Sequence, residues 1–222
     1  VELVSVQLPG RASRAAEPPF DRMEPLLDAL EEATAPLLDI PPAFFGHSMG
    51  AVLAFELARR RRARGLPLPL HLFVSGRRAP HVPDDHPPLS ELPDDRFVAE
   101  LRRLGGTPEG VLEDPELLAI LLPALRADFR LVERWQSPPG APLDVPITAF
   151  GGDRDADVPE PHLHAWREHT TAPFALHVVP GDHFFLHASE PELVDRVARV
   201  LADRSVGTTG TTPGGQPDAS NQ

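Results

Sequence analysis

One stretch decides the fold: Ala43-Phe44-Phe45-Gly46-His47-Ser48-Met49-Gly50, a short apolar run that leads directly into the pattern G-x-S-x-G. The alanine- and leucine-rich residues 49–63 that follow predict a helix. Glycines on both sides permit a strained strand-to-helix turn, which lifts Ser48 above the carboxyl edge of a sheet. The helix N-terminus and the amide of Met49 would then face a developing oxyanion. The pattern predicts a serine nucleophile; the plainer alternative is a glycine-rich turn with a capping serine.

A serine hydroxyl is a weak nucleophile, so it needs a base and an acid that orients the base. In this kind of turn the chain order is Ser, then Asp or Glu, then His. Three carboxylates follow the apolar run that ends at Phe150, namely Asp153, Asp155 and Asp157. We choose Asp155, because a Gly-x-x-Asp-x-x-Val pattern places it just beyond the end of the strand, and Asp153 is the second choice. For Asp153 and Asp157 we prefer the interpretation of a solvated acidic loop.

Ten histidines compete for the role of base. We choose His183, because it follows the predicted strand 175–179 across the turn Pro180-Gly181-Asp182, where a catalytic base is expected. His187 is a weaker substitute, and His47 suits packing beside the nucleophile better than proton transfer. No metal site is expected, since His162 and His164 are spaced i, i+2 and no convincing partners accompany them.

In the rest of the chain, predicted strands alternate with predicted helices. Apolar runs predict further strands at residues 3–8, 70–74 and 145–150, and helical spacing predicts helices at 23–38, 163–169 and 190–201. This alternation favours an α/β domain over residues 1–204, with a mostly parallel sheet and helices on both faces. Residues 76–143 break the alternation with leucine-rich helical patterns and predict an inserted helical lid. Residues 205–222 are rich in Gly, Thr, Pro and Ser, and we expect a disordered tail.

Composition excludes several classes of function. The 222 residues contain no cysteine and no lysine, which removes thiolate chemistry and Schiff-base chemistry. A formal net charge of -12 argues against binding nucleic acid. The sequence contains no apolar run long enough to span a membrane and no basic-then-apolar leader, so a cytoplasmic location is the default expectation.

With the three residues placed, the surrounding motifs resemble the type II thioesterases of polyketide and nonribosomal peptide synthesis, which are α/β-hydrolases. The resemblance runs from Val1 to about Leu201 and rests on Val6-Gln7-Leu8-Pro9-Gly10-Arg11, Gly46-His47-Ser48-Met49-Gly50-Ala51, Phe73-Val74-Ser75-Gly76-Arg77-Arg78-Ala79-Pro80, Leu104-Gly105-Gly106-Thr107-Pro108 and Gly181-Asp182-His183-Phe184-Phe185. It implies hydrolysis of acyl thioesters on the phosphopantetheine arm of acyl or peptidyl carrier domains, which removes stalled or wrongly primed chains in antibiotic-type biosynthesis.

The resemblance also implies roles for individual residues. Ser48 would form the acyl-enzyme, His183 would shuttle the proton and Asp155 would orient His183, with no cofactor of the enzyme's own. Residues 76–143 match the family's lid, which would shape the acyl pocket and meet the carrier protein. The family normally has, upstream of the residues printed here, a first core strand and a Gly-rich loop that supplies the second oxyanion amide. We therefore expect the chain to be a fragment of a longer gene product.

Other functions are also compatible with these sequence patterns. A chain-releasing thioesterase or an esterase would use the same triad, an acyltransferase would use a Ser and His pair, and a non-catalytic carrier-binding module would use none of it. Carrier recognition is predicted for Arg77, Arg78 or the basic run 59–64, facing an acidic helix of the carrier. Solvated arginines at helix ends are an equally good interpretation of these residues.

Overall fold

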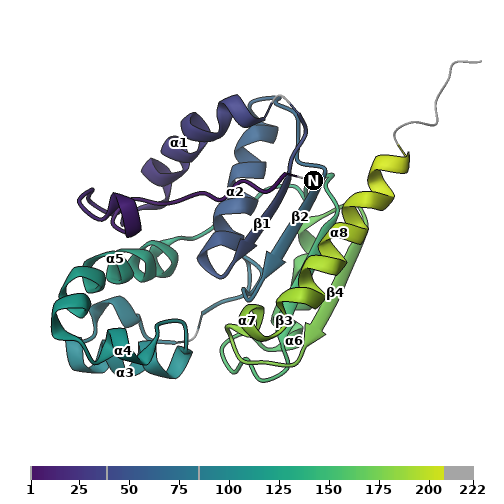
Figure 1. The fold of residues 1–222 in the computed structure, drawn as a ribbon. Coiled ribbons are helices and arrows are strands. Elements are labelled where there is room, and N and C mark those ends of the chain that lie inside the picture. The colour runs from purple at the N-terminus through teal and green to yellow at the C-terminus, as the bar shows by residue number, and fades with distance from the viewer. Residues whose placement is uncertain (1, 39, 85, 208–222) are drawn as a thin grey trace, which may run out of the picture.

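The centre of the molecule is one parallel sheet. The computed structural model describes residues 2–38, 40–84 and 86–207, and within them four strands form the sheet in the order β1-β2-β3-β4 (Figure 1). Each strand is hydrogen-bonded in parallel to the next. The α/β fold expected from the alternating pattern is confirmed by this topology. The strands are β1 Ala43–His47, β2 His71–Ser75, β3 Ile147–Gly152 and β4 Phe174–Val179.

Helices cover both faces of the sheet. Leu72 and Phe73 of β2 point to opposite faces because successive strand residues alternate. Leu72 packs in a cluster with Phe55 of α2, whereas Phe73 packs with Phe185 and Leu193 of the last two helices. None of the described helices is long and apolar enough to cross a membrane. The helices of this body are α1 Met23–Thr34, α2 Met49–Ala63, α6 Glu160–His164, α7 Phe185–Ala188 and α8 Glu190–Gly207.

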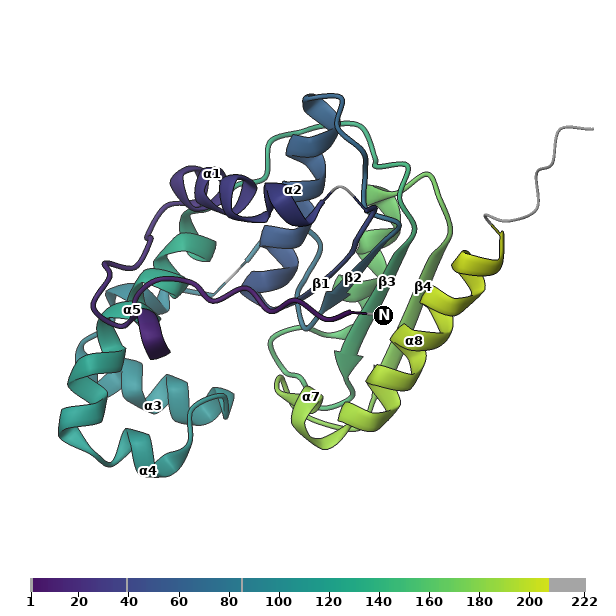
Figure 2. The same cartoon turned by 45° about the horizontal axis from the view of Figure 1, so that its top comes forward.

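Residues 76–143 form a helical group beside the sheet, on the side away from α8 (Figures 1 and 2). Its apolar cluster is centred on the buried side chains of Phe97, Leu101 and Leu112, and every residue packed against these three also comes from the group. Leu131, near the end of the longest helix, packs instead with α1 and α2 and so joins the group to the body. The helices are α3 Asp94–Leu104, α4 Glu109–Leu112 and α5 Pro115–Arg134. We call residues 76–143 the lid.

Two predictions need correction or extension. The strand predicted at residues 3–8 is wrong, because this segment pairs with no other strand in the described part of the chain and its Leu3 side chain is 87% exposed. An apolar run forms a strand only where a neighbour accepts its backbone hydrogen bonds. Helix α8 continues to Gly207, three residues into the predicted tail. Residues 208–222 of that tail lie outside the described residues.

Candidate active site

Ser48 occupies the sharp turn between β1 and α2. Its backbone has φ 51° and ψ -114°, an unfavourable conformation for a residue with a side chain. The Ser48 amide donates to the carbonyl of Ser75 at 2.8 Å, which ties the turn to the end of β2. A side chain at Gly46 would overlap the carbonyl group of Gly50. The Ser48 side chain caps no backbone amide of α2, so the alternative of an ordinary capping serine does not hold. The strained turn predicted from G-x-S-x-G is therefore present.

The structure brings His183 and Asp155 together. His183 Nδ1 lies 2.7 Å from Asp155 Oδ2, and the two side chains are 12% and 1% exposed. The other carboxylate oxygen, Oδ1, accepts from the amides of Asp157 at 3.0 Å and Val158 at 3.1 Å. Burial would raise the pKa of Asp155, but the hydrogen bond and charge of His183 together with the two amides outweigh burial and lower the pKa. Asp155 is thus held as a carboxylate that can orient the imidazole.

The neighbouring carboxylates have other partners. Asp153, the second choice for the acid, accepts from the amide of Gly181 at 2.8 Å and pairs with Arg154, so it stabilises the loop that follows β4. Asp157 forms a two-pronged ion pair with Arg103 of the lid. Both residues are therefore engaged within the molecule, rather than being only solvated as the sequence suggested. Of the three carboxylates, Asp155 is the one bonded to His183.

His47 lies against His183. Its ring centroid is 5.2 Å from that of His183, and its Nδ1 lies 2.9 Å from Ser75 Oγ. Burial and the charge of His183 lower the pKa of His47 to about 3, so the ring is neutral at ordinary pH. Its Nε2 is buried and has no hydrogen-bond partner among the described residues. This placement fits the packing role expected for His47. His187 lies on α7, where its ring stacks on Phe184.

Met49 is the first residue of α2. Its amide is therefore one of the four at the start of a helix that have no acceptor within the helix. The positive end of the helix macrodipole lies at the same place. These two features make the Met49 amide available to an oxyanion formed on a group bound at Ser48.

Most of the arginines expected to meet a carrier protein bind other groups within the molecule. Arg78 is buried, donates to the carbonyl groups of Pro83 and Asp157, and pairs with Asp84. Burial lowers the pKa of Arg77. Within the basic run, Arg61 is buried. The other four arginines bind acidic side chains or carbonyl groups, namely Arg59, Arg60, Arg62 and Arg64. Arg78 is therefore committed to contacts within the molecule, whereas carrier binding by Arg77 or by the basic run stays a prediction.

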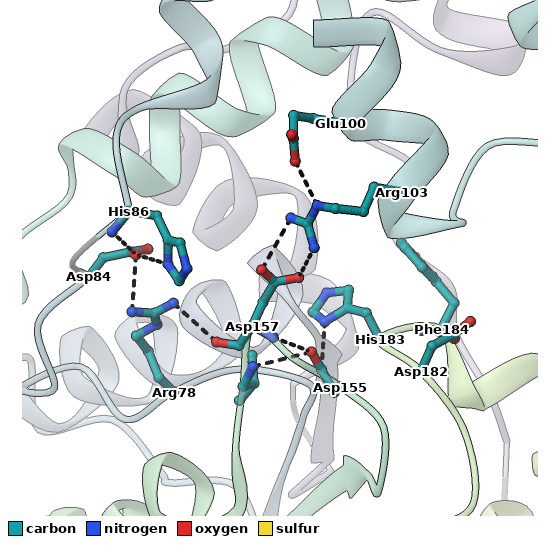
Figure 3. A network of polar contacts seen from close by, with 11 residues as sticks. Arg78, Asp84, His86, Glu100, Arg103, Asp155, Asp157, Asp182, His183 and Phe184 are labelled. Carbon is teal, nitrogen blue, oxygen red and sulfur yellow. Dashed lines mark hydrogen bonds and ion pairs between the residues drawn. The ribbon is translucent and has the colours of Figure 1, made fainter. Parts of the chain in front are cut away.

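The lid contacts both loops that carry the pair of Asp155 and His183 (Figure 3). Arg103 of α3 binds Asp157, two residues after the acid. Gly106, just after α3, lies so close to the ring of Phe184 that a side chain there would overlap it. Sequence reasoning missed both contacts. Only the glycine pair in Leu104-Gly105-Gly106 gave a local signal, because glycine permits such close approach.

Comparison with known proteins places these features in a family. The family model of the thioesterase domain matches residues 1–203. The gramicidin S biosynthesis protein GrsT of Aneurinibacillus migulanus is 47% identical over 201 residues, which cover 90% of this chain and 78% of that protein. RedJ, a thioesterase from the prodiginine pathway of Streptomyces coelicolor, is 42% identical in sequence. Its structure matches with a TM-score of 0.81 over 86% of this chain and 76% of the RedJ chain. The type II thioesterase BorB from the borrelidin biosynthetic cluster is 42% identical, covers 88% and 79% of the two chains, and has a TM-score of 0.80.

Proposed function

The chain belongs to the thioesterase family, among the type II thioesterases of polyketide and nonribosomal peptide pathways, and we propose that it hydrolyses acyl thioesters carried on the phosphopantetheine arm of carrier domains. In this role the protein removes stalled or wrongly primed acyl groups from the synthetase. The observation that carries the proposal is the 2.7 Å bond between His183 and Asp155, at the sheet edge where the strained turn presents Ser48.

The first half of the reaction transfers the acyl group to Ser48. The hydroxyl oxygen attacks the thioester carbonyl carbon while His183 Nε2 takes the hydroxyl proton. Asp155 stabilises the imidazolium that forms. The Met49 amide donates to the oxyanion of the tetrahedral intermediate. When this intermediate collapses, the carbon–sulfur bond breaks and His183 returns the proton to the departing thiolate, which leaves as the carrier thiol.

The second half releases the acid. His183 Nε2 takes a proton from a water molecule, whose oxygen attacks the acyl carbon of the Ser48 ester. The second tetrahedral intermediate collapses and His183 protonates Ser48 Oγ, so free carboxylic acid leaves and the enzyme is restored. An acyltransferase would instead pass the acyl group to a second acceptor and release no free acid.

The experiment is acid release from an acetyl-loaded or propionyl-loaded carrier protein by the full-length gene product. We expect hydrolysis by the wild type and its loss in Ser48→Ala, because only the nucleophile is removed. Folding of the variant is checked by circular dichroism. A folded wild type that binds the carrier without releasing acid would contradict the proposal and favour a non-catalytic binding module. Release from simple esters but not from the carrier would favour an esterase.

A further inference from the structure

An ion pair links the lid to the loop that carries Asp155. Arg103, near the end of α3, holds Asp157 with two parallel contacts, from Nη1 to Oδ2 at 3.0 Å and from Nη2 to Oδ1 at 3.1 Å (Figure 3). Its Nε donates to Glu100 on the same helix at 2.7 Å, which fixes the plane of the guanidinium. The side chains of Arg103 and Asp157 are 46% and 22% exposed. Such two-pronged pairs define geometry more strictly than a single contact does.

Asp157 touches the triad through its backbone. Its amide donates to Asp155 Oδ1 at 3.0 Å, and the amide of Val158 donates to the same oxygen at 3.1 Å. Its carbonyl accepts from Arg78 Nη2 at 3.2 Å. Asp157 is therefore held by its side chain from α3 and by its carbonyl from Arg78, in the segment that follows β2. These contacts hold the Asp157 amide in the direction of Asp155, the acid that orients His183.

The same end of α3 also meets the loop of the base. Gly106 packs against the ring of Phe184, the residue after His183, and a side chain at Gly105 would come within 3.8 Å of Asp182 Oδ2. The apolar cluster around Phe97 and Leu101 lies entirely within the lid, so it does not hold this end of α3 against the body. The ion pair with Asp157 and the contact with Phe184 connect this end of α3 to the body.

We propose that Arg103 is a positioning residue for the triad, which acts by holding Asp157 so that the loop amides stay directed at Asp155. This inference rests on the proposed function, because it assigns the triad its catalytic role. Docking of the lid and orientation of the base are thereby coupled. Loss of the ion pair lets the acid loop relax, which leaves the imidazole of His183 less well oriented toward Ser48. The loss therefore acts on the reacting groups, and so on kcat, more than on KM.

The test measures the rate at which a fluorophosphonate modifies Ser48 in the full-length protein, together with kcat and KM for a small acyl thioester. We expect Arg103→Ala and Asp157→Asn each to lower the labelling rate and kcat by about tenfold, with KM changed less than about twofold. Because the two residues act as one pair, the double variant should lose no more than either single variant. The matched control is Arg102→Ala on the same helix, since Arg102 pairs with Glu109 inside the lid.

The outcomes separate this inference from the proposed function. The inference would be overturned if the fluorophosphonate labelled Arg103→Ala as fast as it labels Arg102→Ala. It would also be overturned if the rate loss of the double variant were the product of the losses of Arg103→Ala and Asp157→Asn. A drop in labelling that merely parallels a loss of thermal stability would also count against it. Labelled wild type that hydrolyses no carrier thioester would overturn only the substrate assignment. Wild type that is folded but never labelled would overturn both.

Discussion

His183 Nδ1 lies 2.7 Å from Asp155 Oδ2, although 28 residues separate them in the chain. Asp155 follows β3 and His183 follows β4, and the carboxyl ends of adjacent parallel strands meet at one edge of the sheet. An ionised carboxylate can only accept, so Nδ1 donates and Nε2 is left to take a proton. The relationship fixes the tautomer that a serine nucleophile needs.

Replacing the acid tests this tautomer. We expect Asp155→Asn to lower kcat for thioester hydrolysis by about 10³–10⁴, because an amide can hold the imidazole in the wrong tautomer. KM should change little. Steady-state kinetics at pH 7 make the measurement. Asp153→Asn is the matched control, since Asp153 bonds the amide of Gly181. Equal losses of kcat in the two variants would contradict the assignment of Asp155.

The neutral state of His47 makes stability depend on pH. The pKa of His47 falls from 6.5 to about 3 in the folded protein, so between those values the unfolded chain binds a proton that the folded protein does not. Stability therefore falls as pH falls through this window, by at most about 1.4 kcal/mol per pH unit for this group. We expect His47→Gln to lose that part of the slope in urea unfolding measured from pH 4 to 7. An unchanged slope would show that His47 is protonated in the folded state.

Because Gly76 has no side chain, the ring of His47 can pack directly against it. Gly76 has φ +57°, and a side chain there would lie 2.5 Å from His47 Cε1. Gly65 has φ +66° with open space around it, so it is a matched control for the backbone cost alone. We expect Gly65→Ala to lose about 1–2 kcal/mol of stability, and Gly76→Ala to lose more and also to lower kcat. Thermal unfolding and kinetics check this, and equal stability losses without a change in kcat would contradict it.

Arg78 is expected to act on folding and not on the carrier. Arg78→Ala removes the buried partner of Asp84 and of two carbonyl groups, which should cost about 1–3 kcal/mol in total. Arg64→Ala, which breaks a pair with Glu31 on an exposed side chain, should cost less than about 1 kcal/mol. Thermal unfolding measures the two variants, and the carrier KM should stay the same in both. A raised KM at unchanged stability in Arg78→Ala would restore the docking role.

Much of the fold could be predicted because its signals are local. The predicted helix 49–63 coincides with α2, and the predicted strands 70–74 and 175–179 lie within one residue of β2 and β4 at each end. Asp155 and His183 can be chosen from the sequence because they follow the predicted strands 145–150 and 175–179, and the order of strands in a parallel sheet determines which loops meet.

Contacts between distant residues could not be predicted in the same way. The pair of Arg103 and Asp157 joins residues 54 apart, and neither position carries a pattern that names its partner. The burial of Arg78 is likewise set by the path of the chain after β2, which charge alone does not reveal. The strand predicted at residues 3–8 failed for a related reason, because pairing depends on a neighbouring strand.

The acyl-enzyme tests the central claim most directly. The full-length protein is mixed with propionyl-loaded carrier, quenched within the first turnovers, digested and analysed by mass spectrometry. We predict a propionyl group on the peptide that contains Ser48, and none on that peptide in Ser48→Ala or in the unreacted protein. Free propionate released by wild type with no acyl group on Ser48 at any time, or an acyl group on another residue, would contradict the account.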